Sequence, residues 1–192
     1  MSLSADTLPP TSDIKASRSY LRWGLLALIQ LALIAIPLAD RLQVQMSGTV
    51  VPMELVPVDP RDLLRGDYVI INLAIARIST DVPGTDSAEI GERIFVGLRS
   101  EGKGPAKPVV VARDRKDAGR LAIEGTVNRI TGDFVQVDYG IDAFFLPEGE
   151  GRFIEDLDTS RVMLEVAIDE EGQSLPLTLL VDGKVFKSDG TF

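Results

Sequence analysis

The chain of 192 residues contains no cysteine and no histidine. Without cysteine it can form no disulfide, and it has no thiolate nucleophile or zinc–thiolate site. Without histidine it has no Ser-His-Asp or Cys-His catalytic set, and it lacks the commonest metal ligand. What remains is the chemistry of carboxylates, of a Ser/Lys pair, or of metals bound through oxygen. We therefore expect no transition metal and no cofactor.

Basic residues are scarcer than acidic ones. The chain has 20 Lys and Arg against 29 Asp and Glu, which gives a net charge of −9. Such a chain repels nucleic-acid phosphates and anionic headgroups. The sequence has no basic stripe with interleaved aromatic residues, so we expect no nucleic-acid partner. Its hydrophobic fraction of 45% is sufficient for a sizeable core.

One long stretch without charge runs from Trp23 to Ala39. As a helix rising 1.5 Å per residue it is about 26 Å long, at the short end for crossing a bilayer. We predict one transmembrane helix over residues 20–41, in contact with membrane lipid. Its strongly polar residue, Gln30, is either a tolerated amide or a hydrogen-bonding group for another membrane helix. Pro37 is compatible with the end of the helix.

The charges around this stretch predict its orientation. Lys15, Arg18 and Arg22 precede it, whereas Asp40 and Arg41 follow it and cancel. Residues 1–19 are rich in Ser, Thr, Pro and Asp, which predicts a disordered tail. The positive-inside rule places this tail in the cytoplasm and residues 42–192 in an extracytoplasmic, or periplasmic, domain of a single-pass inner-membrane protein. Two alternatives remain: a cleaved signal peptide, which Pro37 fits poorly at the −3 position of a cut after Ala39, and a buried helix of a soluble protein.

Beyond the apolar stretch, short strand-like runs alternate with Gly, Pro and Asp turns. The predicted strands are Val44–Leu55, Tyr68–Ile78, Arg93–Arg99, Pro108–Arg113, Arg120–Ile130, Phe134–Tyr139, Ala143–Leu146, Arg161–Ile168, Leu175–Val181 and Lys184–Phe186. Asp182-Gly183 is a strong hairpin signal. The pattern predicts a mainly β, antiparallel or barrel-like domain with at most one short helix, near Gly151–Asp156.

The densest group of charges lies just before the second of these strands. It consists of Asp59, Arg61, Asp62, Arg65 and Asp67. These side chains could form a salt-bridge network that fixes the start of the strand, or a surface that recognises a partner protein through Arg–carboxylate contacts. A catalytic carboxylate pair is the less favoured interpretation.

The segment from Pro60 to Asp67 is similar to one in the membrane-anchored signal peptidases. Those enzymes use a Ser/Lys pair, which requires both groups within hydrogen-bond reach. Here no serine lies between Leu55 and Asp59, and no lysine lies between Asp67 and Glu101. The similarity therefore implies at most a related, catalytically degenerate β scaffold.

A second resemblance covers most of the chain after the anchor. Gly66-Asp67-Tyr68, followed by Ile71 and Ile75, resembles the signature of the bacterial GDYXXLXYXI membrane-protein family, although Leu73 stands where the signature has tyrosine. The resemblance extends to the segment from Tyr139 to Gly149. It implies a single-span anchored protein that acts with a multi-pass membrane protein, and it implies no established activity.

These observations favour a non-enzymatic accessory or interaction protein of a membrane complex. The alternative is an enzyme of cryptic carboxylate type or a degenerate peptidase relative. The residues that we expect to carry the interaction are Asp59, Arg61, Asp62, Arg65, Gly66, Asp67, Tyr68, Tyr139, Phe145 and Glu148.

Overall fold

The computed structural model describes residues 13–56, 68–70, 72–101, 104–141, 143–145, 157–158 and 161–188. The chain divides into two compact units, residues 1–40 and 41–192. The described part is mainly β, with antiparallel sheets and one long apolar helix near the N-terminus, as the sequence predicts.

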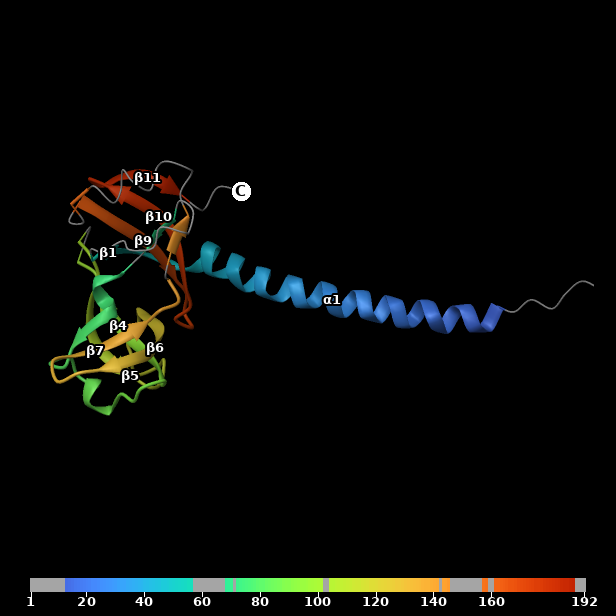
Figure 1. The fold of residues 1–192 in the computed structure, drawn as a ribbon, viewed down its shortest axis with the longest axis horizontal. Coiled ribbons are helices and arrows are strands. Elements are labelled where there is room, and N and C mark those ends of the chain that lie inside the picture. Colours follow the sequence, from blue (N-terminus) through green and yellow to red (C-terminus); the bar gives the residue numbers. More distant parts are fainter. Residues whose placement is uncertain are drawn as a thin grey trace, which may run out of the picture. The chain divides into compact units, whose positions relative to one another are not determined.

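Helix α1 spans Asp13–Ser47 (Figure 1). From Tyr20 onward it is long and apolar enough to cross a membrane. The helix passes through Pro37 and does not end there, and the strand predicted to begin at Val44 is wrong at that end because Val44 belongs to the helix. A proline removes only one hydrogen-bond donor from a helix, and neighbouring groups can compensate for it in a membrane.

The next helix breaker after Pro37 is Gly48, and the helix ends just before it. The Gly48 N–H donates to the Val44 carbonyl at 2.9 Å. A Cβ atom at position 48 would overlap that carbonyl oxygen and would lie 3.0 Å from the Cβ of Ala167. Position 48 therefore requires glycine, because a residue with a Cβ atom does not fit directly after the helix end.

The first sheet has the order β1-β9-β10-β11, with every neighbouring pair antiparallel. Its strands are β1 (Thr49–Glu54), β9 (Val162–Ile168), β10 (Ser174–Val181) and β11 (Lys184–Ser188). The predicted hairpin is confirmed: Val181 pairs with Lys184, and Asp182 and Gly183 between them both have positive φ, at 52° and 73°.

The second sheet has five strands in the order β3-β7-β6-β4-β5. They are β3 (Arg77–Ser79), β4 (Arg93–Arg99), β5 (Lys107–Ala112), β6 (Ala122–Ile130) and β7 (Phe134–Asp138). A 3-10 turn, η2 (Thr85–Ser87), lies in the loop between β3 and β4.

A separate short pair consists of β2 (Tyr68–Ile70) and β8 (Ala143–Phe145). The single strand predicted over Tyr68–Ile78 is therefore wrong: β2 and β3 are separated by the 3-10 turn η1 (Ala74–Ala76). This turn places the side chain of Ile75 in the core, and it lets the chain change partner from β8 to β7. The helix expected near Gly151–Asp156 lies outside the described residues.

Strand β1 also connects the two larger sheets (Figure 1). Ala106, just before β5, donates its N–H to the Pro52 carbonyl of β1 at 2.8 Å. Toward the other edge of the five-stranded sheet, Leu55 forms a bridge with Leu73, and Val56 N–H donates to the Asn72 carbonyl at 2.7 Å. The segments leading into both edge strands, β3 and β5, thus contact β1 or the two residues that follow it.

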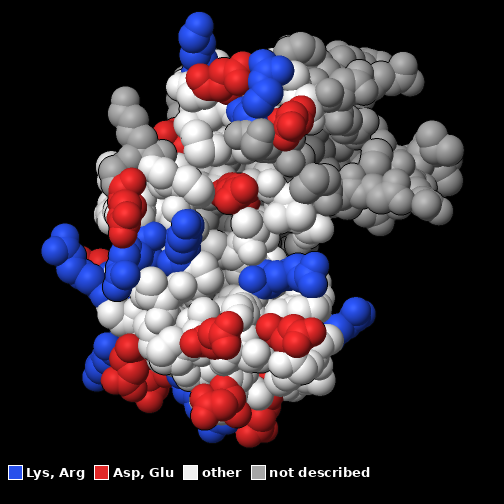
Figure 2. All heavy atoms as spheres, turned by 90° about the vertical axis from the view of Figure 1, so that its left-hand side faces the viewer, with Lys and Arg blue, Asp and Glu red and all other residues white. Residues whose placement is uncertain are grey.

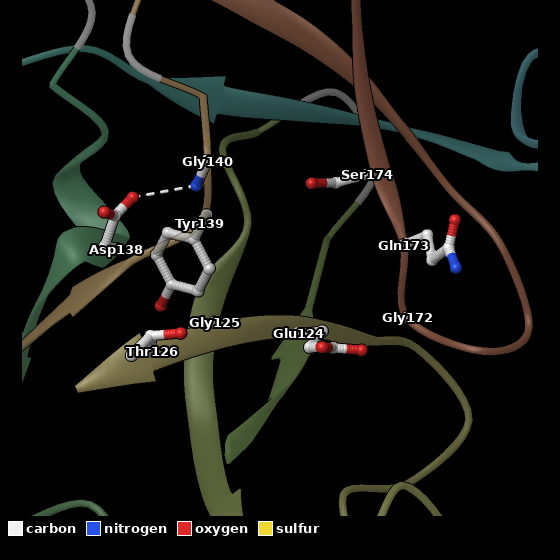
Figure 3. A pocket seen from close by; sticks show the side chains of 9 residues that line it. All are labelled: Glu124, Gly125, Thr126, Asp138, Tyr139, Gly140, Gly172, Gln173 and Ser174. Carbon is white, nitrogen blue, oxygen red and sulfur yellow. Dashed lines mark hydrogen bonds between the residues drawn. The ribbon is translucent and has the colours of Figure 1, made fainter. Parts of the chain in front are cut away.

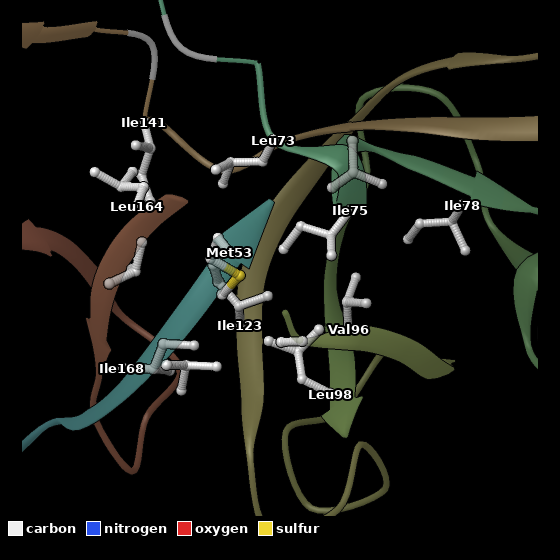
Figure 4. Packing of buried hydrophobic residues seen from close by; sticks show 14 of the residues in the cluster. Met53, Leu73, Ile75, Ile78, Val96, Leu98, Ile123, Ile141, Leu164 and Ile168 are labelled. Carbon is white, nitrogen blue, oxygen red and sulfur yellow. The ribbon is translucent and has the colours of Figure 1, made fainter. Parts of the chain in front are cut away.

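The core lies between the two sheets and centres on β1. Met53 is fully buried, with Leu164 and Ile168 of β9 on one side and Ile123 of β6 on the other (Figure 4). Truncating a fully buried side chain of this size typically costs about 2–5 kcal/mol. The position of β1 is therefore fixed by the side chains of both sheets as well as by its hydrogen bonds.

Candidate functional site

The two sequence segments that carry the family resemblance lie side by side in the fold. Strands β2 and β8 pair antiparallel, and Tyr68 is directly opposite Phe145 in their register. These residues are 77 positions apart in the chain. We call residues 68–75 and 139–145 together the paired-motif region. Two of the predicted interaction residues, Tyr68 and Phe145, are thus register partners within it.

Tyr139 forms a second link between the two segments. Its hydroxyl donates to the Ile75 carbonyl at 2.9 Å, and its ring packs against the hydrophobic core. Burial raises the pKa of the Tyr139 phenol above its ordinary value, because the charged phenolate would lose its water. The phenol therefore stays protonated and acts as a hydrogen-bond donor that fixes η1 against the end of β7.

A glycine in the neighbouring strand makes room for the Tyr139 ring. A Cβ atom at Gly125 would lie 2.5 Å from Val137 Cγ1, 2.8 Å from Tyr139 Cδ1 and 2.9 Å from the Asp138 carbonyl oxygen. A glycine inside a strand commonly marks such a close approach. Gly125 therefore allows the ring to lie across β6 while its hydroxyl reaches Ile75.

An open pocket of about 380 Å³ lies beside this ring (Figure 3). Strand β6, the end of β7 and the turn between β9 and β10 form its walls. The lining residues are Glu124, Gly125, Thr126, Asp138, Tyr139, Gly140, Gly172, Gln173 and Ser174. The pocket therefore borders the paired-motif region at Tyr139 and Gly140.

Two local contacts hold the walls of the pocket in place. The Asp138 carboxylate accepts the Gly140 N–H at 2.8 Å, the dashed line in Figure 3, and Gly140 has a φ of 69°. Across the pocket, Glu124 N–H donates to the Gly172 carbonyl at 2.8 Å. With a φ of 94°, position 172 favours glycine, and it carries the β9–β10 turn onto β6.

The polar side chains of the pocket are already engaged in structural contacts or stand on its rim. Glu124 pairs with Arg93 at 3.4 Å, and Asp138 caps the turn at Gly140. Thr126 and Gln173 are exposed. No lysine is among the lining residues and the chain has no histidine, and no hydrogen bond among the described residues joins the hydroxyl of Thr126 or Ser174 to the carboxylate of Glu124 or Asp138.

The densest charged group falls outside the described residues. It consists of Asp59, Arg61, Asp62, Arg65 and Asp67, and Gly66 and Glu148 also lie outside the described residues. The hydrogen bond between Val56 and Asn72 joins residues on the two sides of this charged segment.

Sequence reasoning missed the pocket residues of β6 and of the β9–β10 turn. Glu124 and Gln173 are 49 positions apart, and no local pattern brings them together. One signal is present in the sequence: Gly125 interrupts an otherwise regular strand, which indicates a close approach of another segment.

Charges of both signs share the face drawn in Figure 2. Blue and red side chains lie interspersed on it, and the described residues of that face do not form one continuous basic area.

Comparison with known proteins identifies the family. The family model described as GDYXXLXY protein matches residues 30–179, which include both segments of the paired-motif region. No curated protein and no solved structure matches the chain. The match covers most of the 192 residues and confirms the resemblance seen in the motif, so the chain belongs to the GDYXXLXY protein family.

Proposed function

We propose that this protein is a non-enzymatic accessory protein of the bacterial inner membrane. In this proposal α1 anchors the chain with its N-terminus in the cytoplasm, and residues 42–192 lie on the periplasmic side. The paired-motif region and the neighbouring pocket contact a multi-pass membrane protein. Neither nucleic acid nor a cofactor takes part.

The paired-motif region carries the proposal. Two segments far apart in the chain are joined by the β2–β8 pairing and by the Tyr139–Ile75 hydrogen bond, and an open pocket lies next to them. The hydroxyls and carboxylates of that pocket form no nucleophile–base pair among the described residues. A surface that two distant segments form together, with a pocket beside it, suits an interaction role better than a catalytic one.

The anchor supports the membrane part of the proposal. Large apolar side chains along α1, among them Leu25, Leu31 and Ile34, are each more than 60% exposed. Exposed apolar surface of this extent is unfavourable in water and favourable in lipid.

The test is copurification of the tagged full-length protein from membranes in mild detergent, with mass spectrometry of the proteins retained. Thr126→Lys places a charge in the pocket, and Asn128→Lys places the same charge two residues along β6, outside the lining set. Both positions are exposed, so both variants should fold. We expect a multi-pass protein with the wild type and with Asn128→Lys, and much less of it with Thr126→Lys.

Two results would count against the proposal. Absence of any membrane protein in the wild-type preparation would remove the partner. Equal recovery with both lysine variants would show that a partner binds elsewhere.

A further inference from the structure

Within the charge-free stretch Trp23–Ala39, helix α1 carries Gln30 and Pro37 on one side. An α-helix turns by about 100° per residue, so Trp23, Ile34 and Pro37 lie within about 40° of Gln30 around the axis. Leu25, Leu28 and Ala32 lie on the opposite side by the same geometry. We call the side that contains Trp23, Gln30, Ile34 and Pro37 the glutamine face. The Gln30 side chain on it is exposed in the single chain.

The glutamine face holds two polar groups that hydrocarbon cannot satisfy. The Gln30 amide has two N–H donors and an acceptor oxygen. Pro37 lies inside the helix and has no N–H, so the Leu33 carbonyl lacks its usual donor from four residues later. Both groups lie within the charge-free stretch Trp23–Ala39, where water is absent if the helix crosses a bilayer.

These two groups complement each other between two copies of the same helix. We propose that α1 pairs in parallel with α1 of a second copy through the glutamine face. Each Gln30 amide donates one N–H to the amide oxygen of the partner's Gln30 and the other to the partner's Leu33 carbonyl. Leu33 is three residues farther along, about 4.5 Å, which a glutamine side chain can span.

A second copy fits this face because a two-fold symmetric pair provides a partner for every donor and acceptor in question. Each chain brings two N–H donors and two acceptors that need partners, and a two-fold pair uses all of them. Copies with the same orientation also place Gln30 at the same depth. A helix of another protein would have to supply a matching set of polar groups at that depth. The inference rests on the proposed membrane anchoring, but not on the proposed partner protein.

The absence of native cysteine permits a direct test in intact membranes. Ala27→Cys lies about 60° from Gln30, whereas Ala32→Cys lies about 160° from it on the far side. Both replace alanine, so they are matched. With a membrane-permeant oxidant, we expect at least roughly fivefold more disulfide-linked dimer from Ala27→Cys than from Ala32→Cys.

The role of the amide is tested in the Ala27→Cys background. Gln30→Leu should lower the yield of linked dimer by roughly three- to tenfold, the effect expected for interhelical hydrogen bonds in a membrane. Gln30→Asn keeps an amide and should retain more dimer than Gln30→Leu. Equal linking at positions 27 and 32, no linking at either, or no effect of Gln30→Leu would overturn the pairing.

Two further measurements on the same membranes distinguish a failure of helix pairing from a failure of the proposed function. Resistance to alkaline extraction reports anchoring, and copurification reports the partner protein. If the chain stays in the membrane and retains its partner but shows none of the position-dependent linking, only the pairing fails. Release of the chain by alkaline extraction would overturn both.

Discussion

Tyr139 links the two segments of the paired-motif region through its hydroxyl. Its ring lies in the space left by Gly125, and its hydroxyl donates to the Ile75 carbonyl of the turn η1. The sequence predicts Tyr139 as an interaction residue. Its structural contacts add a second role, because they position the residues around the pocket.

Tyr139→Phe should destabilise the full-length protein in detergent by about 1 kcal/mol at pH 7, since the Ile75 carbonyl loses its hydrogen bond. Denaturant unfolding followed by circular dichroism measures the change. An unchanged unfolding midpoint would mean that water replaces the phenol at Ile75.

The raised pKa of Tyr139 gives a second, pH-dependent prediction. The unfolded chain loses the phenol proton near pH 10, but the folded chain keeps it, so this contribution is complete below pH 10 and is lost as the pH rises further. The difference in unfolding free energy between wild type and Tyr139→Phe should therefore shrink above pH 10. A constant difference from pH 8 to pH 11 would contradict the burial of the phenol.

Gly125→Ala tests the close approach at the pocket. The added Cβ would lie 2.5 Å from Val137 Cγ1 and 2.8 Å from Tyr139 Cδ1, so β7 or the ring must shift. We expect a loss of about 1–3 kcal/mol in unfolding free energy. Gly132→Ala is the matched control, because a methyl group added there would have nothing within 4 Å and the φ of Gly132 is not positive. Equal effects of the two changes would refute the packing argument.

At the scale of elements, local patterns predict the strands well where both ends have turn signals. The strand predicted over Arg93–Arg99 has the bounds of β4. The errors lie at Val44 and in the segment from Tyr68 to Ile78. There the local sequence permits more than one structure, and contacts with distant segments decide between them: Ala167 at the end of α1, and β8 and β7 around η1.

The same reasoning explains what can be predicted of the candidate site. Tyr68, Tyr139 and Phe145 are identifiable because they belong to two conspicuous motifs. Glu124 and Gln173 are not, since they meet only when the β9–β10 turn packs on β6. The sequence pattern around either residue gives no information about such a long-range contact.

The β10–β11 hairpin provides a prediction for a whole element. Asp182 forms a two-contact ion pair with Arg161, and this hydrogen bond holds the pKa of the Asp182 carboxyl below its ordinary value. The stabilisation is therefore present above the ordinary aspartate pKa and declines as the pH falls through the lowered one. Asp182→Asn keeps a residue that tolerates positive φ but removes the charge, so it should lose stability at pH 7 and almost none at strongly acidic pH.

Denaturant midpoints at pH 7 and at pH 2–3 measure this difference. Asp133→Asn serves as the control, because no ion pair is formed by this turn residue among the described ones. A loss for Asp182→Asn that is the same at both pH values would mean that turn geometry, and not the ion pair, is responsible.

At the scale of the whole molecule, the orientation of the anchor decides which surface meets which compartment. Lys15, Arg18 and Arg22 precede the apolar stretch, and the charges of Asp40 and Arg41 after it cancel. The positive-inside rule depends on such an imbalance close to the span. A reporter that is active only outside the cytoplasm should therefore be active when it is fused after Phe192.

Replacing the three N-terminal bases by glutamine and Asp40 by lysine reverses the imbalance and should move part of the reporter to the cytoplasm. Protease added to spheroplasts gives an independent measurement: it should digest the β unit of the wild type and leave the inverted fraction of the variant intact. A wild-type β unit that resists protease until the membrane is broken, together with an inactive reporter, would place it in the cytoplasm. The paired-motif region would then have to act on a cytoplasmic surface.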